Sequence, residues 1–290
     1  MQSLTRRDFG RFATAAAGVA LPAFGRAPIQ SRFGGVILGV QCYSFRDRPL
    51  DAAIKAMADI GCGECEMNWA HLEPVRLRTD REQLRQWRLT VPLDEFERAG
   101  SLVREAGIDP WAYTYNMKSD FTDAEMARGF EMTRALGARA IVSSPNLSSV
   151  KRIDALAKKY KMRVALHNHS RIAPDELATP GDFAAAGKGM SEYLGFALDL
   201  GHFVASGFDP LLFLRQHHAR TLVVHVKDRK REQGPNVPLG QGDTPIQEVL
   251  RFIRDGKHEI KANIEYEYKG QDTVAEVRRC FEYCKNALLT

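Results

Sequence analysis

The sequence predicts a single α/β domain, a (β/α)8 TIM barrel, after a short N-terminal signal. Three observations predict this fold. Apolar, β-branched runs alternate with amphipathic segments along the chain, about 260 residues hold eight such pairs, and several runs are apolar throughout, as in strands covered on both faces. The 290 residues are 44% hydrophobic and 27% charged, which excludes collagen-like and disordered chains.

Residues 1–27 are predicted to be an export signal. Arg6 and Arg7, with Phe9 two positions after the pair, precede an Ala-rich apolar stretch from Phe12 to Phe24 and resemble a twin-arginine signal. The stretch is too short to span a bilayer, so we expect no stable membrane span after cleavage. Residues 28–290 are then predicted to form a periplasmic or secreted domain. A membrane anchor or a basic tail is the alternative.

The net charge gives no reason to expect a nucleic-acid partner. The formal charge is +5, of which the signal supplies +3 through Arg6, Arg7, Arg11 and Arg26 against Asp8. The remaining domain therefore carries about +2, which is too little to indicate a phosphate-binding surface.

The eight predicted units follow one another in order. The expected strands are Val36–Tyr43, Gly63–Asn68, Pro110–Tyr115, Ala138–Ser144, Arg163–His169, Leu194–Leu200, Thr221–Lys227 and Glu259–Tyr266. The expected helices are Leu50–Ile60, Leu93–Ala106, Asp123–Leu136, Val150–Lys159, Pro180–Tyr193, Pro210–His217, Pro245–Asp255 and Thr273–Leu288. A doubly wound open sheet is the alternative, but no glycine-rich dinucleotide motif follows the first strand.

Two features stand outside this pattern. The polar segment Trp69–Thr90 carries five arginines and is predicted to be a long loop, either a lid over the site or a solvated excursion. The chain also has five cysteines, and we expect most of them to be buried as small hydrophobic residues rather than joined in disulfides. The five cysteines are Cys42, Cys62, Cys65, Cys280 and Cys284.

Ionisable residues gather at the ends of four successive predicted strands, where a barrel of this kind has its active site. Two imidazoles and two carboxylates would converge there, from His167, Asp199, His225 and Glu265. This mixed nitrogen and oxygen set suits Mn²⁺, Zn²⁺, Co²⁺ or Fe²⁺ rather than Ca²⁺. Residues two apart on a strand share a face, so facing alone does not decide between His167 and His169, or between Glu265 and Glu267.

These same segments resemble the xylose isomerase-like TIM-barrel superfamily, and within it the sugar phosphate isomerase/epimerase proteins. The resemblance covers nearly all of residues 28–290. It rests on an ordered set of motifs: Gly39–Asp47 (GVQCYSFRD), Asp199-x-x-His202, His225–Asp228 (HVKD), Leu239–Asp243 (LGQGD) and Ile264–Glu267 (IEYE). The resemblance implies that Asp199, His225 and Glu265 bind a metal and that His202 contacts substrate.

One residue departs from the family pattern. Epimerases of this superfamily carry glutamate at the strand-five ligand position, where this chain has His167. Their two metal-bound glutamates serve as acid and base on opposite faces of the sugar. The departure leaves a keto-glycoside lyase, which needs one base and one acid, as an alternative to an isomerase or epimerase.

The chemistry expected is removal of a proton from the carbon next to a carbonyl of a small sugar or keto-sugar. Glu265 or His169 would take the proton, and His202 would orient a hydroxyl group. Lys227 would neutralise the developing oxyanion, unless it forms a surface ion pair with Asp228.

Further residues are expected to contact the substrate, and other functions remain open. Glu66 would hydrogen-bond sugar hydroxyls, Trp69 would stack on the ring, and Asp228 is a further candidate. A non-catalytic sugar-binding barrel with a structural metal is an alternative, as is a nuclease, which the low net charge disfavours. The sequence does not decide whether the protein forms a homodimer or is a monomer.

Overall fold

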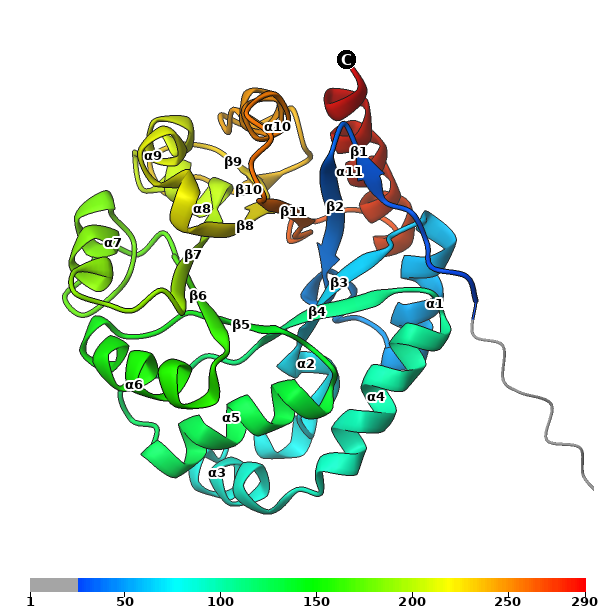
Figure 1. The fold of residues 1–290 in the computed structure, drawn as a ribbon. Coiled ribbons are helices and arrows are strands. Elements are labelled where there is room, and N and C mark those ends of the chain that lie inside the picture. The colour runs from blue at the N-terminus through cyan, green and yellow to red at the C-terminus, as the bar shows by residue number, and fades with distance from the viewer. Residues whose placement is uncertain (1–25) are drawn as a thin grey trace, which may run out of the picture.

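Eight parallel strands close into a barrel in the computed structural model, which describes residues 26–290 (Figure 1). The strand β2 pairs with β3 on one side and with β11 on the other, which closes the sheet and excludes the open alternative. The barrel strands are β2 (Val36–Gln41), β3 (Glu64–Asn68), β4 (Asp109–Thr114), β5 (Ala140–Ser143), β6 (Arg163–His167), β7 (Leu194–Asp199), β8 (Thr221–Val226) and β11 (Lys261–Ile264).

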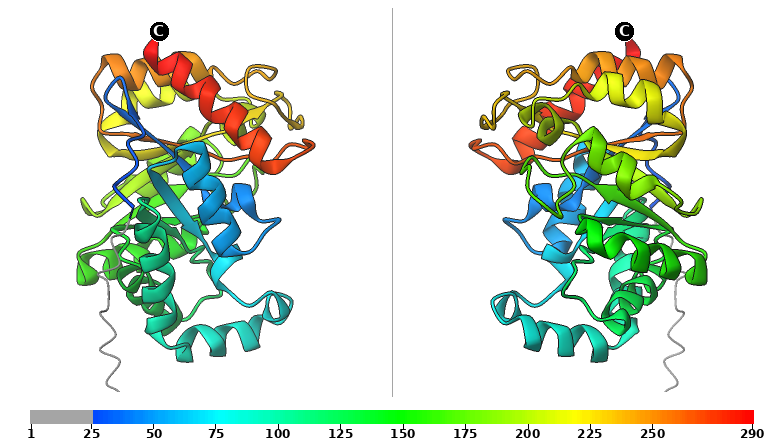
Figure 2. Two further views of the ribbon diagram at one scale, coloured as in Figure 1. Left: turned by 90° about the vertical axis from the view of Figure 1, so that its right-hand side faces the viewer. Right: turned by 90° about the vertical axis from the view of Figure 1, so that its left-hand side faces the viewer.

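Helices surround the barrel and cover the outer face of the strands (Figures 1 and 2). The main helices are α1 (Leu50–Ile60), α4 (Leu93–Glu105), α5 (Asp123–Ala135), α6 (Val150–Tyr160), α7 (Pro180–Gly187), α8 (Leu200–Ala205), α9 (Pro210–His217), α10 (Ile246–Asp255) and α11 (Thr273–Leu289). Short elements complete the chain: β1 (Arg32–Phe33), the pair β9 (Asp228–Arg229) and β10 (Asn236–Val237), and the 3-10 turns η1 (Cys42–Phe45), η3 (Leu147–Ser149) and η4 (His218–Arg220).

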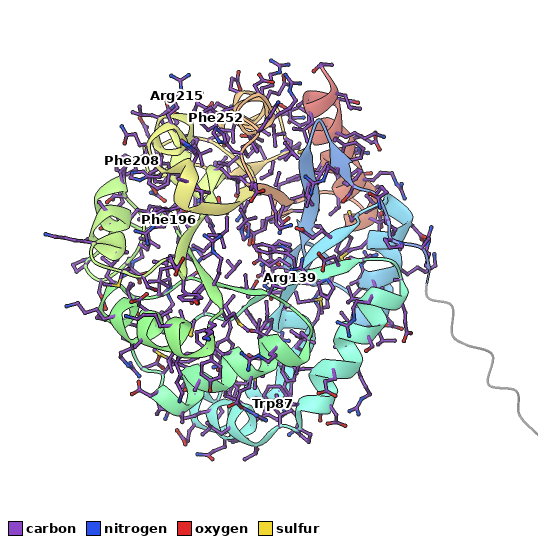
Figure 3. All side chains as sticks on the ribbon, in the orientation of Figure 1. Trp87, Arg139, Phe196, Phe208, Arg215 and Phe252 are labelled. Carbon is purple, nitrogen blue, oxygen red and sulfur yellow. The ribbon has the colours of Figure 1, made fainter. Side chains whose placement is uncertain are left out.

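Side chains fill both the space between strands and helices and the interior of the barrel (Figure 3). The interior cluster combines one large residue, Trp111, with small ones such as Ala140, Ala165 and Ala197. Gly195 is required here, because a Cβ at this position would collide with the side chain of Leu222. The interior is therefore packed solid, and the functional groups lie above it at the carboxyl ends of the strands.

Most predicted elements agree with the structure to within three residues at each end. The predicted helix Pro180–Tyr193 is an exception, since α7 ends at Gly187 rather than at Tyr193. Lys188 leaves the helical conformation with φ −68° and ψ 117°, and Gly189 adopts φ +70°. The pair of glycines around Lys188 ends the helix early.

The prediction of a long loop over Trp69–Thr90 is wrong, because this segment folds into α2 (Trp69–Leu72), η2 (Val75–Leu77) and α3 (Arg81–Thr90). The inward face of α3 is formed largely by arginines. Arg81, Arg85 and Arg88 bind the fully buried carboxylate of Glu125 on α5 at 2.7, 3.3 and 2.8 Å. Hydrophobic periodicity cannot detect a helix that docks through charges.

All five cysteines are free and buried, which confirms the prediction. No helix within residues 26–290 is long and apolar enough to cross a membrane. The predicted export signal lies outside the described residues except for its last two positions, so export remains a prediction.

The arginine cluster predicts a large loss of stability on substitution of Glu125. Glu125→Ala leaves Arg88 buried without half of its carboxylate partners, so we expect a loss of roughly 3 kcal/mol in the free energy of unfolding, measured by urea denaturation. Glu82→Ala removes an exposed partner of Arg85 and serves as the control, with a loss of about 0.5 kcal/mol. Equal losses in the two variants would contradict this role of Glu125.

Candidate metal centre

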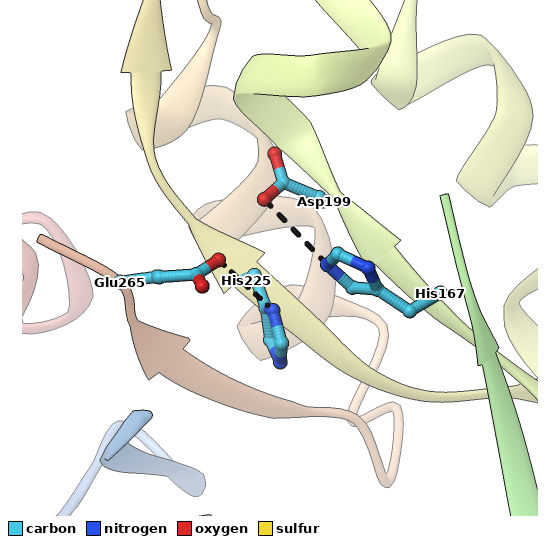
Figure 4. A group of neighbouring side chains, drawn as sticks. All are labelled: His167, Asp199, His225 and Glu265. Carbon is cyan, nitrogen blue, oxygen red and sulfur yellow. Dashed lines mark ion pairs between the residues drawn. The ribbon is translucent and has the colours of Figure 1, made fainter. Parts of the chain in front are cut away.

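The ends of four successive strands bring together the four predicted ligands (Figure 4). His167 ends β6, Asp199 ends β7, His225 lies near the end of β8, and Glu265 follows β11 directly. One ligand atom from each residue lies within 4.8 Å of the other three. The Nε2 atom of His167 is 3.7 Å from Oδ2 of Asp199, and Nδ1 of His225 is 3.3 Å from Oε2 of Glu265.

These four atoms are also buried polar atoms without hydrogen-bond partners among residues 26–290. The two carboxylate oxygens each have an ionic contact with the Lys227 ammonium at 3.0 Å, but none of the four atoms has a hydrogen bond in the described chain. Because a buried polar atom without a hydrogen bond costs about 1–3 kcal/mol, four of them facing one point call for a common partner. A tetrahedral ion with bonds of about 2.0–2.2 Å would hold its ligand atoms about 3.4 Å apart, close to the shorter separations here. The residues therefore fit a divalent metal ion, and the group contains His167 and Glu265 rather than His169 and Glu267.

A buried carboxylate orients His225. Its Nε2 donates to Oε2 of Glu66 at 2.8 Å, which leaves Nδ1 directed at Glu265. Glu66 has no exposed surface and also accepts from Thr114 Oγ1 at 2.6 Å and Gln41 Nε2 at 3.2 Å. Glu66 therefore lies beneath His225, and its placement does not support the predicted contact with substrate hydroxyls.

The charge state of His225 reflects the same neighbours. Burial alone would lower the pKa of His225, but the carboxylates of Glu66 and Glu265 outweigh it and raise this pKa to about 10. The histidine thus sits in a strongly negative environment, which favours any cation placed at the four ligand atoms.

A serine orients the second histidine. Nδ1 of His167 lies 2.9 Å from Oγ of Ser144, and the same hydroxyl lies 3.1 Å from Nε2 of His169. When Nδ1 of His167 donates to this oxygen, its Nε2 is left as a lone-pair ligand. Neither Ser144 nor the Gln41 contact with Glu66 was predicted from sequence, because no spacing rule links the hydroxyl of a residue after β5 to a histidine at the end of β6.

Lys227 places a buried ammonium beside the carboxylates. Its Nζ lies 3.0 Å from Asp199 Oδ2, 3.0 Å from Glu265 Oε2 and 2.7 Å from Glu267 Oε2. The first two are ion-pair contacts without hydrogen-bond geometry, so both oxygens keep a lone pair free. Burial would lower the pKa of Lys227, but the three carboxylates raise it well above its usual value. The alternative of a surface ion pair with Asp228 is excluded.

Asp228 organises a loop instead of facing the cavity. One carboxylate oxygen accepts from the backbone of Gly240 at 2.8 Å and of Gly242 at 2.9 Å, and the other accepts from Thr244 at 3.2 Å. A Cβ at residue 242 would collide with this carboxylate, which explains the glycine there. The structure therefore gives Asp228 a supporting position rather than the predicted substrate contact.

A cavity of about 180 Å³ opens directly above the four ligands. Two carboxylates, the Lys227 ammonium and the imidazoles of His169 and His202 are among the groups that line it. Trp69 contributes an aromatic wall. The cavity is lined by Gln41, Tyr43, Asn68, Trp69, Thr114, Asn116, Val142, Ser144, His167, His169, His202, His225, Lys227, Glu265 and Glu267.

His202 is held neutral with one nitrogen toward this cavity. Burial and the nearby Lys227 keep the pKa of His202 well below its usual value. Its Nδ1 lies 2.9 Å from Nη1 of Arg229 and its Nε2 lies 3.2 Å from Nζ of Lys227. Both of these cations only donate, so a protonated His202 ring would be unfavourable between them.

The chain belongs to the xylose isomerase-like TIM barrel family, whose model matches residues 54–284. The resemblance seen in the sequence motifs is thereby confirmed at the level of the family. No curated protein matches the chain.

Solved structures of two sugar epimerases and of a zinc-binding protein share the fold. An L-ribulose 3-epimerase superposes with a TM-score of 0.67 at 14% identity, covering 87% of this chain and 94% of the other. The 3-keto-D-glucoside 4-epimerase YcjR from E. coli gives 0.63 at 13% identity, covering 87% and 99%. The IOLI protein with a bound zinc atom gives 0.65 at 16% identity, covering 88% and 98%.

The geometry predicts opposite results for two glutamates on the same strand end. Glu265→Gln removes a carboxylate from the ligand group, so metal affinity should fall by at least about tenfold. Glu267→Gln, which changes the neighbour of Lys227 but not the ligand group, should keep the metal. Metal content per chain, measured on dialysed protein, checks both variants. If Glu265→Gln kept its full metal content while Glu267→Gln lost its metal, the ligand at this strand end would be Glu267 rather than Glu265.

Proposed function

We propose that the protein is a metal-dependent isomerase or epimerase that removes a proton next to a carbonyl of a small sugar or keto-sugar. The observation that carries the proposal is the group of four buried ligand atoms beneath the cavity, none of which has a hydrogen-bond partner among residues 26–290. The cavity volume of about 180 Å³ lies below the roughly 300–1,000 Å³ of pockets for drug-sized ligands. A single sugar ring is therefore a fitting occupant.

His167, Asp199, His225 and Glu265 would hold Mn²⁺, Zn²⁺ or Co²⁺. When bound, such an ion supplies Lewis-acid stabilisation of negative charge on substrate oxygens. The bound zinc of the IOLI protein and the epimerase names of two structural neighbours support this assignment.

Groups able to move a proton stand on two sides of the cavity. Glu265 comes from the end of β11, while His169 follows β6, with β8 and β7 between these two strands. An epimerase needs one group that removes the proton and another that returns one from the opposite face. We assign these two roles to His169 and Glu265, so that an imidazole replaces the second glutamate of related epimerases.

Three further residues would position the substrate. The Lys227 ammonium would stabilise negative charge that develops on the carbonyl oxygen. His202 would orient a hydroxyl group, and Trp69 would stack on a face of the ring.

His167 also favours a second candidate function, a keto-glycoside lyase. An elimination needs one base and one acid, and the cavity offers histidines and carboxylates for these roles. Export to the periplasm, proposed from the paired arginines, would give either enzyme access to free sugars and glycosides.

Hydrogen exchange tests this proposal. The metal-loaded protein in deuterated water should exchange a proton next to the carbonyl of a free ketose or a 3-keto-glucoside, observed by NMR. His169→Ala should slow this exchange by about 10²–10⁴-fold with unchanged metal content.

The matched control is His258→Ala. His258 lies before β11, at the other end of the barrel, so this variant should catalyse the exchange at the normal rate. Absence of exchange in a fully metal-loaded protein that binds these sugars would instead indicate a non-catalytic sugar-binding protein.

A further inference from the structure

A second cleft adjoins the catalytic cavity. It has a volume of about 340 Å³ and lies between the α2–η2–α3 segment and the loop after β4. Trp69 and Asn116 line both the cleft and the cavity, so a single ligand can extend from one into the other. The segment that was expected to be a loop thus forms a wall of this second space.

The lining of the cleft is rich in positive charge. It contains four cationic side chains and two carboxylates. Two of the cations are already neutralised: Arg81 binds Asp120 and Glu125 at 2.8 and 2.7 Å, and Arg88 binds Glu73 and Glu125 at 2.7 and 2.8 Å. Of the other two, Arg78 has no carboxylate partner among residues 26–290, and Lys118 has only a distant one, Glu176, at 3.9 Å.

Arg78 is held rigidly without a carboxylate partner among residues 26–290. Its Nη2 donates to the backbone oxygens of Ala70 and Glu73 at 2.6 and 2.8 Å, and its guanidinium carbon lies 5.2 Å from the centre of the Trp69 ring. Its buried Nε has no hydrogen-bond partner in the described chain. The charge of this guanidinium is therefore fixed at the wall of the cleft and is not balanced.

Lys118 stands in the same cleft with a side chain that makes no hydrogen bond within residues 26–290. Its nearest carboxylate oxygen, Oε2 of Glu176, is 3.9 Å away. Partial burial lowers the pKa of Lys118, and the carboxylates of Glu176, Asp175 and Asp120 offset this effect only in part, so the charge has incomplete compensation. An anion placed between Lys118 and Arg78 would provide it.

We propose that this cleft is a subsite for an oxyanion, a carboxylate or a phosphate, carried by the part of the substrate that extends beyond the reacting sugar ring. The substrate class is then an anionic glycoside rather than a free neutral sugar. This extension rests on the proposed function, whereas the oxyanion subsite itself does not. A guanidinium and an ammonium on one cleft suit an oxyanion because both donate charge-assisted hydrogen bonds.

The test measures binding to the metal-loaded protein at low salt by calorimetry. Benzoate and phenyl phosphate are the anionic probes, and benzamide is the neutral isostere of benzoate. We expect benzoate or phenyl phosphate to bind at least tenfold more tightly than benzamide, and the tighter of the two anions identifies the preferred oxyanion. The preference should weaken at high salt.

Two variants assign the preference to the cleft. Lys118→Gln, which breaks no hydrogen bond, and Arg78→Gln should each reduce the preference at least fivefold. Arg76→Gln changes an exposed arginine of the same segment that does not line the cleft, and it should leave the preference within twofold. Equal binding of all three probes, or a preference that survives in both Lys118→Gln and Arg78→Gln, would overturn the proposal.

A second pair of probes separates this proposal from the proposed function. 4-Carboxyphenyl β-D-glucoside should bind at least tenfold more tightly than phenyl β-D-glucoside, with the same dependence on Lys118. If neither glucoside binds but the benzoate preference holds, the sugar cavity fails and the oxyanion subsite stands. If both glucosides bind equally, the sugar cavity stands and the anionic substrate class is wrong.

Discussion

The arrangement of the site depends on the buried hydrogen bond between Glu66 and His225. A carboxylate with no exposed surface is stable only when its oxygens are well paired, and Glu66 is paired by Gln41, Thr114 and His225. These partners come from β2, β4 and β8, so the network ties together strands that meet only because the barrel closes. The same bond turns Nδ1 of His225 toward Glu265 and so sets the direction of the whole ligand group.

Charge balance then governs what surrounds this group. Asp199, Glu265 and Glu267 converge on Lys227, whose ammonium is as deeply buried as the histidines. Lys227 lowers the repulsion among these carboxylates while leaving Oδ2 of Asp199 and Oε2 of Glu265 without hydrogen bonds. The second cleft has an excess of positive rather than negative charge. The buried Glu125 pairs with Arg81 and Arg88 but not with Arg78, which lines the same cleft.

The barrel and the four ligand candidates could be predicted from sequence because both follow from local patterns. Apolar runs mark the strands, and ionisable residues at strand ends must meet at one barrel face. The roles of Glu66 and Asp228 could not be predicted, because an ionisable residue at a strand end looks alike whether it faces a cavity, a histidine or a loop backbone. The helix α3 was missed because its contacts with Glu125 are ionic rather than apolar.

The central claim is that His167, Asp199, His225 and Glu265 share one divalent ion. Anomalous diffraction at the metal absorption edge, from crystals of protein purified with Mn²⁺ or Zn²⁺, tests it most directly. The account predicts one peak about 2.0–2.3 Å from His167 Nε2, Asp199 Oδ2, His225 Nδ1 and Glu265 Oε2. A fully supplied protein with no peak at these atoms, or with its ion bound at His169 or Glu267 instead, would contradict it.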